Sequence, residues 1–195
     1  MKRLVLSATA LCLFLLAGPA GAQTHGSLGD TGIHDRPWDV SVMGYLPWLD
    51  ANGVGIGVDV RLEIPIVPDG FIPSVNDEFS LEPGLAFDYR SWPYTTSCVP
   101  GAGICSVTAT TTVLDVVPQL YGVWSFWATH RFRFYVALGL GYDKAILTDS
   151  SIVGRDPSTI YVDFAAGIFY QFAPGAALRA EMGVQGLKAG VAILF

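Results

Sequence analysis

The sequence predicts an all-β protein, an eight-stranded antiparallel up-and-down transmembrane β-barrel. The first observation is composition: 51% of the 195 residues are apolar and only 14% are charged, whereas an ordinary soluble domain has roughly 25% charged residues. The second is a period of two in the apolar residues over most of the chain. The third is that no run of roughly 18 apolar residues follows the N-terminal segment, which excludes a membrane protein built from helices.

Eight segments of alternating polarity supply the predicted strands. In the four clearest, one face is entirely uncharged and mostly apolar, while the opposite face carries the charges together with many glycines and alanines. Strands whose two faces meet different surroundings produce this pattern. The clear segments are 54–64, 79–89, 132–142 and 160–170, and the weaker ones are 38–48, 114–126, 178–184 and 187–195. An even number of strands brings both ends of the barrel to the same side of a membrane.

The N-terminus predicts export from the cytoplasm. Lys2 and Arg3 precede an apolar run over 4–16, and small residues follow up to Ala22. This is the organisation of a cleaved signal peptide, so we expect residues 1–22 to be removed. Residues 23–37 then form a polar leader, and 38–195 form the barrel.

Two cysteines remain after the expected cleavage, Cys98 and Cys105. An even cysteine count in an exported protein predicts a disulfide, and the Pro- and Gly-containing segment between the two cysteines can bring them together. We expect mass spectrometry without reductant to find this bond. Reduction should loosen 91–107 while the barrel stays folded, as heat-modifiable gel mobility would show. Free thiols in the oxidised protein would contradict the prediction.

A soluble, lipocalin-like barrel also has strands of alternating polarity. Three features favour a barrel surrounded by lipid over this alternative. Small residues on the charged face suit the narrow lumen of eight strands. The chain ends on Phe195, which lies in the apolar register. Aromatic pairs also lie ten residues apart on the apolar face, as Trp38 and Trp48, Phe79 and Tyr89, and Phe132 and Tyr142. Ten tilted residues rise close to the ~25 Å apolar band of an outer-membrane barrel, so we expect the first of each pair at one rim and the second at the other.

With its eight strands, spaced aromatic residues and terminal Phe195, the segment 38–195 resembles the small outer-membrane proteins of Gram-negative bacteria of the OmpA, OmpX and OmpW type. The resemblance implies a location in the bacterial outer membrane, with both termini in the periplasm. It implies outer-membrane lipid as a partner, a monomer, and Phe195 as the signal read by the barrel-insertion machinery. It brings no catalytic residue and no cofactor.

The charged face predicts a charge network inside the lumen. Eight acids and six bases lie in the interior register or beside it, and pairing is expected because an unpaired buried charge costs several kcal/mol. They are Asp59, Arg61, Glu63, Glu82, Asp88, Arg90, Asp115, Arg131, Arg133, Asp143, Asp163, Arg179, Glu181 and Lys188. A structural plug is the first interpretation. The glycines Gly55, Gly57, Gly139 and Gly141 favour the alternative of a narrow conducting path, because they leave space.

The function predicted first is a non-enzymatic structural or surface-interaction role. A narrow channel for small or hydrophobic solutes is the alternative, and an outer-membrane lipid-modifying enzyme is the third. An acyl-transfer enzyme needs a nucleophile with a histidine base; Ser125 lies five residues from His130, but no carboxylate lies close in sequence to orient them. No phosphate loop or metal-ligand spacing is present. Nucleic acid is not an expected partner, because the chain has 17 acidic and 11 basic residues and the basic residues form no cluster in the sequence.

Prolines mark the places where the barrel pattern fits least well. Pro47, Pro83 and Pro118 fall within predicted strands, where a missing N–H interrupts the ladder, so we expect bulges or nearby strand ends. The connection Pro65–Asn76 contains three prolines and is long for a periplasmic turn. The sequence assigns it no role.

Overall fold

A computed structural model describes residues 27–30, 32, 36–47, 54–97, 106–149 and 158–195. The predicted signal peptide, the Cys98–Cys105 disulfide and Trp48 lie outside these residues. Among the residues described, none belongs to a helix long and apolar enough to cross a membrane.

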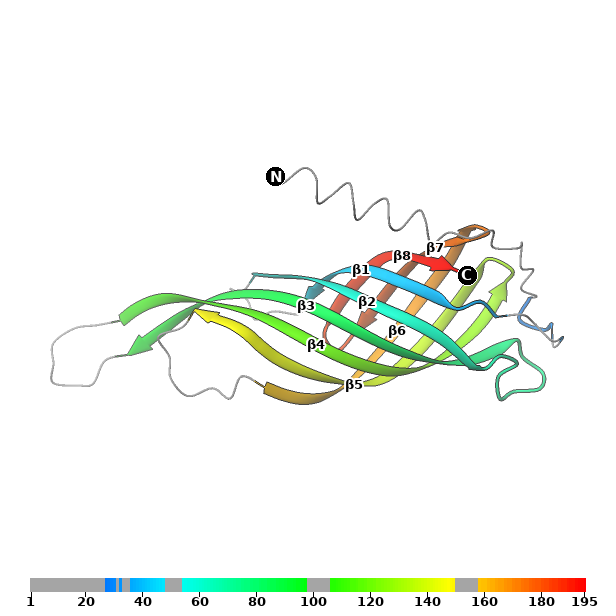
Figure 1. Cartoon of the computed structure of the whole chain (residues 1–195), viewed down its shortest axis with the longest axis horizontal. Coiled ribbons are helices and arrows are strands. Elements are labelled where there is room, and N and C mark those ends of the chain that lie inside the picture. Colours follow the sequence, from blue (N-terminus) through cyan, green and yellow to red (C-terminus); the bar gives the residue numbers. More distant parts are fainter. Residues whose placement is uncertain (1–26, 31, 33–35, 48–53, 98–105, 150–157) are drawn as a thin grey trace.

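Eight strands form one closed sheet in which each strand pairs with its neighbours in sequence and β1 pairs with β8. All pairings are antiparallel, so the predicted up-and-down barrel is confirmed (Figure 1). The strands are β1 (Asp39–Pro47), β2 (Val54–Val67), β3 (Asp77–Ser97), β4 (Ser106–Thr129), β5 (Phe132–Asp149), β6 (Ser158–Ala173), β7 (Ala176–Gly183) and β8 (Gly186–Leu194).

The charged face of the strands points into the barrel and the apolar face points out. Leu138, Val162 and Met182 are 60%, 63% and 60% exposed, whereas Arg61, Glu82 and other charged residues of the opposite register are buried. A soluble barrel would bury its apolar side chains. An apolar exterior around a charged interior is the organisation of a barrel that spans a membrane.

The two ends of the barrel differ. The turns β2–β3, β4–β5 and β6–β7 lie at the same end as both termini of the barrel, where the Phe195 N–H donates to the Trp38 carbonyl at 3.0 Å. We call this the terminal end and the opposite one the loop end. Phe79 is the third residue of β3 and Phe132 is the first of β5, so both also lie at the terminal end, while Tyr89 and Tyr142 lie further along these strands, towards the loop end.

Three neighbouring strands are much longer than the alternation predicted. β3, β4 and β5 have 21, 24 and 18 residues, against 8 and 9 in β7 and β8. The three long strands project beyond the rest of the barrel at the loop end (Figure 1). Alternating polarity marks only the part of a strand that separates lipid from lumen. The β-propensity of Thr108, Thr110, Thr111 and Thr112 predicts that the fourth strand extends further, and β4 includes all four residues.

The strand prolines cause no register shift at Pro83 or Pro118, so the bulges predicted there are wrong. Each proline is paired on one side, Pro83 with Leu120 and Pro118 with Leu85. On the other side the ladder skips two residues while keeping its register. The missing N–H therefore interrupts pairing with one neighbour only. Pro47 is the last residue of β1.

The connection between β2 and β3 is shorter than predicted. β2 continues to Val67, with a register shift between Pro65 and Val67. The turn itself covers residues 68–76, and we call it the 68–76 turn.

Candidate functional site in the barrel lumen

Two arginines and two glutamates form the centre of the lumen. The Arg61 guanidinium donates to Glu82 at 3.3 Å and to Glu181 at 2.9 Å. The Arg179 guanidinium contacts the same two carboxylates, at 2.5 Å and 3.3 Å. All four side chains are almost completely buried. Each glutamate therefore bridges both guanidinium groups, and the cluster ties β2, β3 and β7 together across the barrel.

A second layer of charges extends this central cluster. Asp59 accepts from Arg61 at 2.8 Å and from the Lys188 ammonium group at 2.8 Å. The Lys188 ammonium also lies 3.6 Å from Glu181. The Arg61 guanidinium lies 4.2 Å from the centroid of the Tyr121 ring, a distance at which a cation is attracted to the aromatic face. Buried charges in this layer are thus paired and hydrogen-bonded, as a low-dielectric interior requires.

A separate cluster around Arg133 fills the lumen nearer the terminal end. The Arg133 guanidinium binds Glu63 at 2.6 Å and Asp39 at 3.3 Å, and it lies 3.6 Å from Glu78. The ring of Phe169 lies 4.2 Å from the guanidinium carbon. This one arginine and its ring partner therefore span the lumen from β1, β2 and β3 to β5 and β6.

Arg36 closes the terminal end from the leader that precedes β1. Its guanidinium donates to the Pro68 carbonyl at 3.0 Å and to the Asn76 side-chain oxygen at 2.5 Å, and it lies 3.5 Å from Glu78. Its guanidinium carbon also lies 5.3 Å from the centroid of the Trp127 ring. Burial lowers the pKa of the Arg36 guanidinium, and the neighbouring Glu78 carboxylate opposes that shift. The leader thus supplies a cationic plug at the mouth of the barrel.

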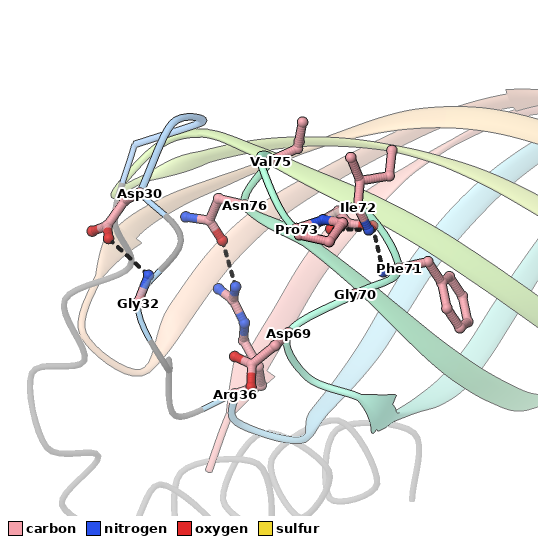
Figure 2. A pocket seen from close by; sticks show the side chains of 11 residues that line it. Asp30, Gly32, Arg36, Asp69, Gly70, Phe71, Ile72, Pro73, Val75 and Asn76 are labelled. Atoms are coloured by element: carbon pink, nitrogen blue, oxygen red, sulfur yellow. Dashed lines mark hydrogen bonds between the residues drawn. The ribbon is translucent and has the colours of Figure 1, made fainter.

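The 68–76 turn holds the leader in place. The Asn76 N–H donates to the Leu28 carbonyl at 2.8 Å, and the Asn76 side chain donates to the Ser27 carbonyl at 3.1 Å. Figure 2 shows Arg36 and Asn76 facing each other beside the pocket that the leader and the turn enclose. We call Arg36, Asn76 and the leader residues bound to them the terminal cap.

The loop end of the lumen carries an excess of negative charge. The Arg90 guanidinium forms an ion pair with Asp88 and lies 3.2 Å from Asp143 and 3.5 Å from Asp115. The Tyr45 hydroxyl donates to Asp88 at 3.0 Å. Arg90 and Asp143 are partly exposed, whereas Asp88 is buried. One arginine therefore gathers three carboxylates from β3, β4 and β5.

Gly57, Gly139 and Gly141 leave no open path, which corrects the argument made for conduction at these three positions. A Cβ at Gly57 would overlap the Tyr45 ring, one at Gly139 the Tyr121 ring, and one at Gly141 the Tyr161 ring. A further pair, Gly167 and Tyr135, packs in the same way. Glycine is needed at these positions because a tyrosine ring from the adjacent strand lies against the backbone.

We expect Gly139→Ala to destabilise the barrel by about 1–3 kcal/mol, the range for overpacking a well-filled interior. The added methyl would meet both the Tyr121 ring and the Leu120 carbonyl. Gly44→Ala is the matched control, because a Cβ there meets only the Ala189 carbonyl at 3.8 Å. Urea unfolding in lipid vesicles measures both variants. Equal free energies of unfolding for the two variants would show that the Tyr121 ring does not depend on the space left by Gly139.

The structure places one predicted lumen residue elsewhere. Arg131 lies exposed in the β4–β5 turn, outside the lumen, because Thr129 and Phe132 pair with each other and leave it beyond the last ladder position. Asp163 lies inside and accepts from the Tyr121 hydroxyl at 2.7 Å. Phe195 is exposed on the lipid-facing side of the barrel wall.

The residues considered for catalysis do not come together. Ser125 is fully buried inside the barrel, whereas His130 is exposed in the β4–β5 turn. Within the described ranges no group of three or more His, Cys, Asp or Glu residues is arranged to hold a metal ion.

Sequence reasoning missed several residues of the charge clusters. Asp39 lies in the polar register of the predicted segment 38–48 and could have been included, and Glu78 could have been found by extending the alternation one residue before 79–89. Tyr121 and Tyr135 also follow the interior register, but a tyrosine on a polar face gives no sign of the glycine it covers. Arg36 precedes β1 and belongs to no alternating segment, so only the tertiary structure places it in the lumen.

Comparison with known proteins shows similarity in fold only. No protein-family model matches the sequence, and no curated protein is significantly similar to it. Among solved structures, a de novo designed transmembrane β-barrel aligns at 15% identity and a TM-score of 0.46, covering 84% of this chain and all of the other. The attachment invasion locus protein Ail of Yersinia pestis aligns at 14% identity and a TM-score of 0.39, covering 82% of this chain and 96% of Ail. Its complex with the heparin analogue sucrose octasulfate aligns at 17% identity and a TM-score of 0.38, covering 81% and 93%. The barrel assignment depends on the strand order and register described above.

Proposed function

We propose that this protein is a non-enzymatic, monomeric outer-membrane barrel with a closed lumen, which presents the projecting part of β3, β4 and β5 at the cell surface for contacts. Its membrane partner is outer-membrane lipid, and Phe195 is the signal for the barrel-insertion machinery. The observation that carries the proposal is the combination of a filled interior with strands that extend on one side only.

The filled interior favours a structural barrel over a channel. Charges cross the lumen at the Arg133 cluster and again at the Arg61–Arg179 cluster, and the terminal cap covers the mouth beyond them. Moving an ion along this path would require separating buried ion pairs, which costs several kcal/mol per pair. A solute path would therefore need a large rearrangement.

The projecting strands supply the surface. β2 pairs with β3 only as far as Ser91, so Trp92–Ser97 has no described partner strand on that side. β5 pairs with β4 only from Thr112 onward, so Ser106–Thr111 likewise has none on the other side. The paired strands β3 and β4 continue beyond the last described pairing of either neighbour, and an extended β-ribbon of this kind can bind a segment of another protein. The projection therefore supports a surface-interaction role.

Planar-bilayer recordings test the closed lumen. We expect the folded protein to give no unitary conductance, and Arg36→Ala to give none either, because the two inner clusters remain. Steady conductance in the unmodified protein would favour the channel alternative and overturn the proposal.

Labelling of intact cells tests the surface placement. In a Cys98→Ser/Cys105→Ser background, we expect Thr110→Cys on the projection to react with a membrane-impermeant maleimide. Ser74→Cys in the 68–76 turn is the matched control and should react only after the outer membrane is opened. Both positions are exposed in the folded barrel. The reverse pattern would contradict the proposed orientation.

A further inference from the structure

Asp77 is a carboxylate in the outward-facing register of the barrel wall, where the other side chains are mostly apolar. It begins β3 in the register of Phe79, Leu81 and Leu85, whose side chains point to the lipid-facing exterior. Asp77 is nevertheless fully buried. A segment outside the sheet must therefore cover it and satisfy its oxygens.

The 68–76 turn provides that cover. The Asp77 carboxylate accepts from the Phe71 N–H at 2.9 Å, from the Ile72 N–H at 3.3 Å and from the Trp124 indole N–H at 2.8 Å. Gly70 has a φ of 61°, and a Cβ there would overlap the carboxylate. The turn is thus folded against the outer surface of the barrel and held there by one buried side chain.

This fold places Phe71 beside the aromatic residues of the terminal end. Its ring lies 5.5 Å from Phe79 and 6.3 Å from Trp124. The contacts continue from Trp124 to Phe126 at 5.0 Å and from Phe126 to Phe134 at 5.3 Å. We call these five rings the aromatic row. It runs along the exterior of β3, β4 and β5.

Phe71 is 60% exposed although it packs against this row. In Figure 2 its ring lies on the opposite side of the turn from Arg36 and Asn76, which close the lumen. One side of the turn therefore serves the terminal cap, and the other continues the lipid-facing surface. Aromatic rings concentrate at the membrane–water interface because they fit the boundary between headgroups and acyl chains.

We propose that the 68–76 turn is a membrane-interface anchor, with Phe71 inserted among the phospholipids of the leaflet at the terminal end. The proposal rests on the membrane location proposed above. It assigns a role to the long connection that the sequence left unexplained: one segment both caps the lumen and fixes the depth of the barrel in the lipid.

A fluorescent label on the turn tests the anchor. In the Cys98→Ser/Cys105→Ser background, Phe71→Cys and Ser74→Cys are each labelled with the environment-sensitive dye NBD and folded into phosphatidylcholine vesicles. We expect the dye at position 71 to emit at shorter wavelength and to lose emission when spin-labelled phosphatidylcholine is added. The dye at position 74, an exposed position of the same turn, should do neither. Equal behaviour of the two dyes would overturn the proposal.

Two further variants separate the possible failures. Leu138→Cys, on the lipid-facing wall, must be quenched if the barrel spans the membrane at all. Quenching at 138 without quenching at 71 overturns the anchor and leaves the proposed function standing, whereas no quenching at 138 overturns both. Adding Gly70→Ala to the labelled Phe71→Cys protein should reduce the quenching towards that at position 74. Heat-modifiable gel mobility checks that each protein is folded. If the Gly70→Ala protein does not fold, the difference in quenching between the dyes at positions 71 and 74 tests the anchor by itself.

Discussion

Glu82→Gln is expected to destabilise the barrel by about 3–5 kcal/mol, the range for removing one partner from a buried ion pair. The carboxylate accepts from both Arg179 and Arg61, which lie in different strands. The neutral amide would leave the Arg179 guanidinium with Glu181 as its one charged partner among the described residues, while Arg61 would keep Glu181 and Asp59. The loss is large because neither arginine can reach water without opening the barrel wall.

Equilibrium unfolding in urea, in lipid vesicles, measures this effect. Arg131→Gln is the control, since it also removes one charge but in an exposed turn, and it should change stability by no more than about 0.5 kcal/mol. Similar stabilities for the two variants would mean that the central cluster is hydrated and does not seal the lumen.

Leu138→Arg is expected to cost about 2–4 kcal/mol, the value for arginine on the lipid face near the middle of a membrane. Leu138 is 60% exposed on β5, and Gly139 beside it faces the lumen against the Tyr121 ring. The cost arises because the new charge has neither water nor an acidic partner within the lipid.

Tyr142→Arg is the matched control for depth. Tyr142 lies four residues further along β5 on the same exposed face, and arginine near an interface costs only about 0–1 kcal/mol. Unfolding titrations of both variants in the same vesicles give the comparison. Equal losses would contradict the assigned depths, and no loss at Leu138 would contradict its contact with lipid.

The sequence by itself determined the number of strands and the side of each strand that faces inward. Alternation is local, since each residue of a strand points opposite to its neighbours, and so Asp59, Arg61 and Glu63 could be assigned to one face without knowledge of the rest. The same logic placed Leu138 and Phe195 outside. It failed for Arg131, where the ladder ends and alternation has no meaning.

Only the tertiary structure decided which charges pair. Arg179 and Glu82 are 97 residues apart in the chain, and closing the barrel brings β7 and β3 to opposite sides of one narrow lumen. Sequence analysis could not predict three further contacts: the plug formed by Arg36, the packing of a tyrosine ring over Gly139, and the turn that covers Asp77. Each depends on a contact between segments whose separate patterns indicate only polarity or turn formation. The physical reason is that the period of a strand specifies the direction of a side chain, whereas its partner depends on barrel closure and on the path of the turns.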